Sequence, residues 1–175
     1  MTTAIYENVS EEIINSTQEI FSTMIPMELK PEDTFYQNEE MLTTDVIALV
    51  SFTGEYSGII ALFCEKDIAL KITSNMLGME VTELDHDTKD AIGEVTNMIA
   101  GTLKNKVYKT FGAMHLSVPI VIGGAELSIS SCGAESHKVR ISSSVTCNSQ
   151  SSWSITPFSS SELSFKVGLI VKKND

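Results

Sequence analysis

Positive charge is scarce in this sequence. Twelve Lys and Arg residues stand against 23 Asp and Glu residues in a chain of 175, which gives a formal net charge of −11. A surface of that sign repels the phosphates of DNA and RNA and the head groups of anionic lipids. We therefore expect no nucleic acid and no membrane among the partners of this protein.

Long hydrophobic runs are missing as well. The longest apolar runs, at 46–50, 58–64 and 167–171, fall far short of the roughly 20 residues that a helix needs to span a bilayer. The first residues, MTTAIYENVSEE, contain neither a basic region nor an apolar stretch of signal-peptide length. These absences predict a cytoplasmic protein.

Cysteine is also rare. The three cysteines lack the spacing of metal ligands: Cys64, Cys132 and Cys147. Cys64 lies in an apolar strand pattern and is predicted to be a small buried residue. The other two lie in a serine-rich region and are predicted to be free thiols in a reducing compartment. No serine or cysteine is spaced with the three histidines to suggest a catalytic triad, and no metal site is predicted.

What is present is the composition of an ordinary globular protein, with 42% apolar and 20% charged residues. The length suits a single domain over 1–175. The patterns predict a helix over 9–24 with Ser10 as its N-cap, a short helix over 67–76 ended by Gly78, and a long helix over 87–111 with Asp85 or Asp87 as its cap.

The β-prone segments predict an antiparallel sheet. Two apolar strands at 45–52 and 56–64 are joined by a turn at Thr53-Gly54-Glu55, which is typical of a β-hairpin. The other expected strands are 114–122, 126–131, 138–147, 153–158 and 163–172, with a turn at Gly123-Gly124 and a serine-rich hairpin around 142–161. Pro119 indicates an edge or bent strand. The predicted class is α+β in two layers: about six strands, two long helices and one short helix.

The long helix carries two distinct faces. One stripe is apolar in character, as expected of a buried face: Ile92, Thr96, Ile99, Leu103, Val107 and Thr110. The opposite line contains two carboxylates, an amide and a glycine: Asp90, Glu94, Asn97, Gly101, Lys104 and Tyr108. Glycine within a helix costs roughly 1 kcal/mol relative to alanine, so Gly101 suggests that something approaches closely. We predict that this outward face is the working surface.

The pattern Asp90-x3-Glu94-x2-Asn97 on a long helix, with Pro119 about one strand later, resembles the signature of the CheC/CheX/FliY phosphatases of bacterial chemotaxis. The similarity extends over most of the chain, since the segments FSTMIPMEL, DVIALVSFTGEYSGIIALFCEK and LSFKVGLIV fit the CheX-like branch. Two departures are that Pro119 lies one residue early and that the serine-rich region before Trp153 is longer than the family pattern.

The resemblance implies a CheX-like phosphatase that hydrolyses the aspartyl-phosphate of a CheY-like response regulator. Asn97 would hold the attacking water, and Glu94 would pair with the regulator's active-site lysine. Asp90, Gly101 and Lys104 would support the helix or contact the partner. Mg²⁺ would belong to the regulator, so neither a cofactor nor a metal is expected on this chain.

The resemblance also implies a homodimer formed through sheet edges. The strand with Pro119 and the strand over 163–172 are the candidate edges. The particular regulator, its pathway and the dimer interface are not determined by the sequence.

Alternatives remain open at this point. Taken alone, Glu94 and Asn97 are more typical of a solvated helix face than of a catalytic pair. Two further hypotheses for this fold are a module that binds a regulator or a flagellar-switch component without hydrolysis, and a purely structural dimer. A second Glu-x2-Asn pair, Glu12 and Asn15, has no matching downstream proline and is predicted to be a capping acid and a surface amide in the first turns of its helix.

Overall fold

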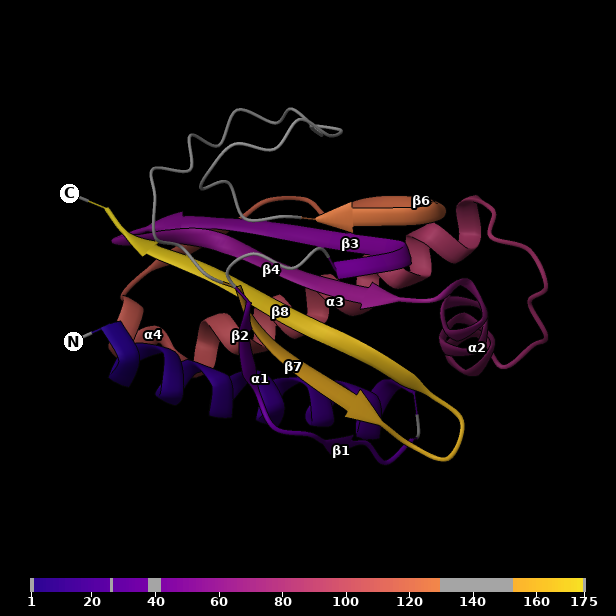
Figure 1. Cartoon of the computed structure of the whole chain (residues 1–175), viewed down its shortest axis with the longest axis horizontal. Helices are drawn as coiled ribbons and strands as arrows, with labels where there is room; N and C mark the ends of the chain where they lie inside the picture. The colour runs from indigo at the N-terminus through magenta and orange to yellow at the C-terminus, as the bar shows by residue number, and fades with distance from the viewer. Residues whose placement is uncertain (1, 26, 38–41, 130–152, 175) are drawn as a thin grey trace.

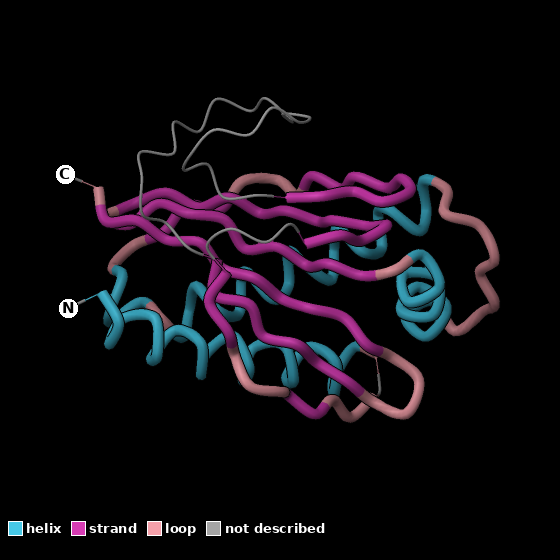
Figure 2. The backbone as a smooth tube through the Cα atoms, in the orientation of Figure 1, coloured by secondary structure: helices cyan, strands magenta, loops and turns pink. Residues whose placement is uncertain are grey.

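The computed structural model describes residues 2–25, 27–37, 42–129 and 153–174. They form two layers, an antiparallel sheet with helices packed on one face (Figures 1 and 2). The predicted α+β class is confirmed. The chain ends at 2 and 174 lie at the same end of the molecule in Figure 1.

The helical layer consists of two long helices, one shorter helix and one single turn: α1 (Thr2–Met24), α2 (Lys66–Leu77), α3 (His86–Lys106) and α4 (Tyr108–Phe111). The two long helices α1 and α3 pack against each other and run in opposite directions (Figure 1). As predicted, α2 ends at Gly78, whose φ of 68° is left-handed and suits glycine at a helix C-terminus.

The sheet has eight strands, in the order β1-β7-β8-β4-β3-β5, with β2 paired to β7 and β6 paired to β3. Their bounds are β1 (Lys30–Pro31), β2 (Phe35–Gln37), β3 (Leu42–Gly54), β4 (Tyr56–Cys64), β5 (Met114–Leu116), β6 (Ile120–Ile129), β7 (Trp153–Ser159) and β8 (Ser164–Lys173). The predicted hairpin is confirmed as β3 and β4, which pair from Val46↔Cys64 to Phe52↔Gly58. Strands β1 and β2 are too short to give a strand pattern, and the predicted strand over 114–122 is divided into β5 and the start of β6 by residues 117–119.

The main core lies between the sheet and the helices. Alternate residues of β3, among them Val46, Ala48 and Val50, point into it and are fully buried together with Phe21 of α1 and Ile99 of α3. This alternation follows from the two-residue period of a strand. The opposite sheet face carries a smaller buried cluster of Ile47, Ala61, Phe63, Trp153 and Ile155.

The prediction for the start of α1 was wrong. The helix begins at Thr2, so Ser10 lies inside it, where its Oγ is 3.1 Å from Ser154 Oγ of β7. No Gly or Pro interrupts the preceding residues, and the helix continues back to Thr2. Glu12 and Asn15 therefore lie near the middle of α1 and not in its first turns.

Two predictions for the sheet were also wrong. Gly123 and Gly124 lie inside β6 rather than in a turn, because the side chain of Leu84 would come within 3.0 Å of a Cβ at Gly123 and only glycine leaves it room. The last strand, β8, is not an edge, since it pairs with both β4 and β7. The edge expected at Pro119 exists: β6 pairs only with β3 within the described residues.

Burial also explains the chemistry of Cys64. The thiol lies in the core, and burial, followed by the charges of Glu65 and Asp45, raises its pKa to about 12. It is therefore a packed, unreactive side chain, as predicted. Cys132, Cys147, the predicted strand at 138–147 and the first part of the serine-rich segment lie outside the described residues.

Candidate active site

The helix that carries the candidate site begins at a strong cap. Asp85 accepts a hydrogen bond from the Thr88 N–H at 3.0 Å, and the Thr88 Oγ1 donates to the Glu83 carbonyl at 2.7 Å. This N-cap satisfies one of the free N–H groups at the start of α3. The hydrogen bond from the Thr88 N–H also lowers the pKa of Asp85. The cap fixes where the helix begins and thereby its rotation on the sheet.

One face of α3 packs on the sheet and on α1. Its fully buried residues include Ile92, Ile99 and Leu103, as the apolar stripe predicts. Thr96 is buried too, and its hydroxyl donates to the Ile92 carbonyl at 2.8 Å, so burial leaves no polar atom without a partner there. Thr110 is exposed, contrary to the predicted stripe, because α3 ends at Lys106 and a separate turn follows.

The predicted working face of α3 points away from the core. Asp90 and Glu94 are exposed, whereas Asn97, Gly101 and Lys104 are half-buried. Asp90 turns back along the helix, where its Oδ2 lies 3.0 Å from His86 Nδ1. Within the described part of the chain, the Glu94 carboxylate and the Asn97 amide make no hydrogen bond or ion pair. Both groups are thus available to another molecule.

A short loop between β5 and β6 lies against α3 beside this pair. A Cβ at Gly93 would lie 3.6 Å from Cβ of Pro119 and 3.1 Å from Cγ2 of Val121, so glycine lets the loop lie against the helix backbone. The start of the loop is tied to β3: the Ser117 N–H donates to the Ser51 carbonyl at 2.8 Å, and the Ser51 N–H donates to Ser117 Oγ at 3.0 Å. The wall beside Asn97 is therefore held at both ends.

On the other side of Asn97 the surface is hollowed. A shallow, open depression of about 410 Å³ lies over Gly101, and a Cβ atom there would meet nothing within 4 Å. The other residues that line it are Ile20, Met98, Thr102, Lys104, Asn105 and Leu116. Since Gly101 follows Asn97 by four residues, the hollow opens about one helical turn beyond the amide.

Known proteins share this sequence and architecture. The family model described as "Chemotaxis phosphatase CheX" matches residues 46–142, which is more than half of the chain. The chain belongs to this family. The CheX family prediction made from Glu94, Asn97 and Pro119 is thereby confirmed.

Individual members of the CheX family agree with this assignment. The CheY-P phosphatase CheX of Thermotoga maritima is 29% identical over 122 residues, which cover 69% of this chain and 79% of that protein. The crystal structure of CheX from Desulfovibrio desulfuricans matches with a TM-score of 0.78 and 26% identity, covering 94% of this chain and 99% of that one. A CheX–CheY–BeF3–Mg²⁺ complex from Borrelia burgdorferi shares the fold, with a TM-score of 0.68, 19% identity and coverage of 93% and 97%.

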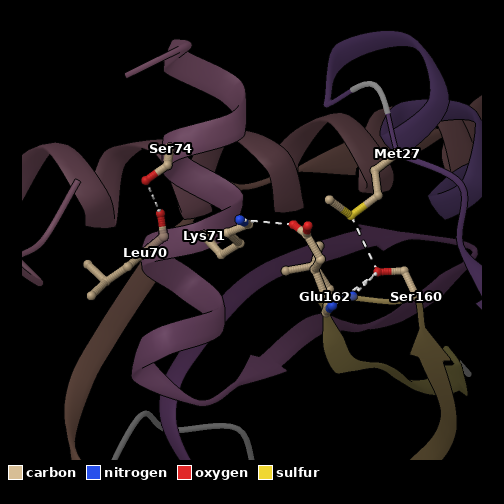
Figure 3. Close-up of polar contacts among 7 residues, drawn as sticks. Met27, Leu70, Lys71, Ser74, Ser160 and Glu162 are labelled. Carbon is tan, nitrogen blue, oxygen red and sulfur yellow. Dashed lines mark hydrogen bonds and ion pairs between the residues drawn. The ribbon is translucent and has the colours of Figure 1, made fainter. Parts of the chain in front are cut away.

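A larger hollow, of about 1900 Å³, lies elsewhere, between α1, α2 and the β7–β8 loop. Several of the side chains that line it pair with one another (Figure 3). Lys71 of α2 pairs with Glu162 of the β7–β8 loop at 2.9 Å. Ser160 Oγ accepts hydrogen bonds from the N–H groups of Glu162 and Leu163, at 3.2 and 3.0 Å. These contacts join the chain's own elements.

Two features of the site were missed in the sequence. Gly93 was not singled out, although a glycine directly before Glu94 is the signal for close packing at that point. The wall formed by the β5–β6 loop was not predicted either, since the hydrogen bonds of Ser117 to Ser51 join residues far apart in the chain. No group of three or more His, Cys, Asp or Glu side chains suited to a metal ion occurs within the described ranges. None of the described helices is long and apolar enough to cross a membrane.

Proposed function

We propose that this CheX-family protein hydrolyses the aspartyl-phosphate of a CheY-like response regulator by placing Glu94 and Asn97 in the regulator's active site. The observation that carries the proposal is the pair itself on α3, with Glu94 exposed, Asn97 half-buried and both unpartnered within the described residues, beside a loop held against Gly93. The names of two relatives support it: the Thermotoga maritima protein is a CheY-P phosphatase, and the Borrelia burgdorferi CheX was crystallised with CheY.

Asn97 is suited to positioning the attacking water. Phosphoryl transfer leaves little work for a strong base, and its catalysis consists mainly of alignment and charge stabilisation. The amide both donates and accepts hydrogen bonds without adding negative charge next to the phosphate. The rigid helix α3 holds it at a fixed height, so a water bound to it would meet the phosphorus in line.

Glu94 is suited to a cation of the partner. Its carboxylate would repel the phosphoryl group but would attract a lysine in the regulator's active site. Residues three apart on a helix are neighbours, so Glu94 and Asn97 enter one cleft together. A Mg²⁺ ion on the regulator would neutralise developing charge on the phosphoryl oxygens; Glu94 and Asn97 are left to align the lysine and the water.

The other predicted residues have supporting roles. Asp90 is engaged with His86 and stabilises the first turns of α3. Lys104, at the C-terminal end of the exposed line, is placed to meet the acidic surface of a regulator. Gly101 keeps the helix surface low beyond Asn97.

The deciding experiment measures the decay of a phosphorylated CheY-like regulator with the purified protein. Replacing Asn97→Ala should lower the catalysed rate by about 10²-fold or more, the scale for loss of a positioned group. A variant as fast as the wild type would remove the assignment. Regulator binding of equal strength with no turnover by the wild type would instead favour the non-catalytic binding module.

A homodimer through the edge of the sheet is a separate proposal. Strand β6 offers a row of backbone groups along one side, since its partner within the described chain is β3 alone. Two copies joined along β6 would continue the sheet across a two-fold axis. Light scattering at micromolar concentration tests this idea, and the mass of a single chain would contradict it.

A further inference from the structure

Gly101 costs helix stability, yet nothing in the described chain requires a glycine there. It lies well inside α3, where glycine is unfavourable relative to alanine. A Cβ atom at this position would have no neighbour within 4 Å. Gly93 differs, because Pro119 and Val121 occupy the space that its missing side chain leaves. Gly101 therefore leaves a space that the chain itself does not fill.

The hollow over Gly101 shares Gly101 and Lys104 with the proposed catalytic face. Leu116 lines the hollow, while Pro119 lies against Gly93 one turn before Asn97. The β5–β6 loop thus runs alongside α3 from the height of Gly101 to that of Gly93. Val118 lies between Leu116 and Pro119 in the chain, and Asn97 lies midway between the two glycines on α3.

Val118 adds an exposed apolar side chain to the β5–β6 loop. It is 79% exposed, the most exposed of the large apolar residues described. It follows Ser117, which is tied to Ser51 by two hydrogen bonds, so little ordering would remain to be done on binding. Leu116 and Met98 extend the apolar surface into the hollow.

We infer that the hollow over Gly101, together with the exposed Val118 two residues after Leu116, is a docking site that receives an apolar side chain of the regulator's receiver domain and thereby sets the depth at which Asn97 enters the active site. This inference rests on the proposed function. It assigns binding to the hollow and chemistry to the pair. A contact one turn from the amide restrains the partner's orientation without touching the phosphoryl group.

The test fills the hollow from within. Gly101→Leu should raise KM for a purified CheY-like regulator phosphorylated with acetyl phosphate by about 10-fold, the scale of a lost central contact, while kcat stays within about twofold. The same change should raise the midpoint of thermal unfolding, because leucine favours the helix more than glycine. Ser22→Leu, which adds the same side chain to an exposed helical position at the larger hollow, is the matched control and should alter neither kinetic constant.

A second variant changes Val118 in the β5–β6 loop. Val118→Asp should weaken binding of the regulator carrying beryllofluoride by about 10-fold, whereas Asn97→Ala should leave that binding nearly unchanged while abolishing turnover. An unaltered KM in Gly101→Leu would overturn the docking assignment. So would a Gly101→Leu variant whose KM is unaltered and whose oligomeric mass changes instead. If the wild type does not speed dephosphorylation but Gly101→Leu still weakens binding, the proposed hydrolysis fails and the docking site stands.

Discussion

The chain contains the same Glu-x2-Asn pattern twice, on its two long helices, and the two copies lie in opposite environments. On α3, Asn97 is flanked four residues before and after by Gly93 and Gly101. On α1, Asn15 is flanked at the same distances by Glu11 and Glu19. Residues four apart lie on one helical face, so these flanking positions decide what can approach each amide.

The α1 copy is closed to an anion. Glu11, Glu12 and Glu19 place three carboxylates around Asn15, which would repel a phosphoryl group. Glu19 is in addition engaged with Lys106 of α3 at 3.0 Å. Asn15 borders the larger hollow, which is also lined by Ser160 and Glu162 of the β7–β8 loop. The residues around Asn97, more than the Glu-x2-Asn pair itself, make the α3 copy a candidate site.

Replacing both side chains of each Glu-x2-Asn pair should give the largest difference in activity between the α3 copy and the α1 copy. The double variant Glu94→Ala/Asn97→Ala should bring regulator dephosphorylation to the uncatalysed rate, a loss of at least about 10²-fold. Glu12→Ala/Asn15→Ala should keep the wild-type rate, because that pair meets no phosphoryl group. Initial rates of phosphate release report both. A substantial loss in the α1 variant, with its helix content intact by circular dichroism, would show that α1 carries a second site.

Removing only the charge of Glu94 or of Glu12 should give a smaller difference in kinetics between the two copies. Glu94→Gln keeps the shape but removes the attraction for the regulator's lysine, so KM should rise by about 10-fold and kcat should fall less. The matching change Glu12→Gln should leave KM unaltered. Steady-state kinetics at two ionic strengths provide the check, since the effect of Glu94 should shrink as salt screens it. An effect of Glu94→Gln on kcat alone would refute a docking role.

The position before Glu94 tests the wall of the site. Gly93→Ala requires only a small displacement of Val121 and should reduce activity by no more than about twofold, whereas Gly93→Leu should displace Pro119 and reduce it about 10-fold. Glu11→Leu, at the position before Glu12, serves as the control and should have no effect. Thermal unfolding of each variant distinguishes a displaced loop from a misfolded chain. Full activity in Gly93→Leu would mean that the loop plays no part.

The start of α3 should give the smallest effect. Asp85→Ala removes the cap and should lower the midpoint of thermal unfolding by a few degrees, while Asp85→Asn, an equally good N-cap, should lower it less. The pKa of Asp85 is below its ordinary 3.8 in the folded protein, so its carboxylate contributes stability above that pH and loses the contribution as the pH falls further. Melting curves from neutral to acidic pH should show the loss of stability that protonation of Asp85 causes in the wild type. This loss should be missing in Asp85→Asn.

Local patterns in the sequence predicted much of the fold. The hairpin β3–β4, the capped ends of α2 and α3 and the buried stripe from Ile92 to Leu103 each depend on neighbours within a few residues. The start of α1 was mispredicted, because the cap signal at Ser10 lies inside a helix that begins at Thr2. The turn at Gly123-Gly124 was mispredicted, because packing of Leu84 against β6 overrode the local signal. The position of β8 between β4 and β7 is likewise a matter of long-range pairing.

The candidate site likewise has features that local spacing determines and features that depend on tertiary packing. By itself the sequence determined that Glu94, Asn97 and Gly101 share one face of a helix, because helical geometry fixes that from spacing alone. Only the tertiary structure decided that Pro119 lies against Gly93, that Lys106 engages Glu19, and that the space over Gly101 stays open. These contacts join residues brought together by the packing of separate elements, and no local period in a chain encodes which elements will meet.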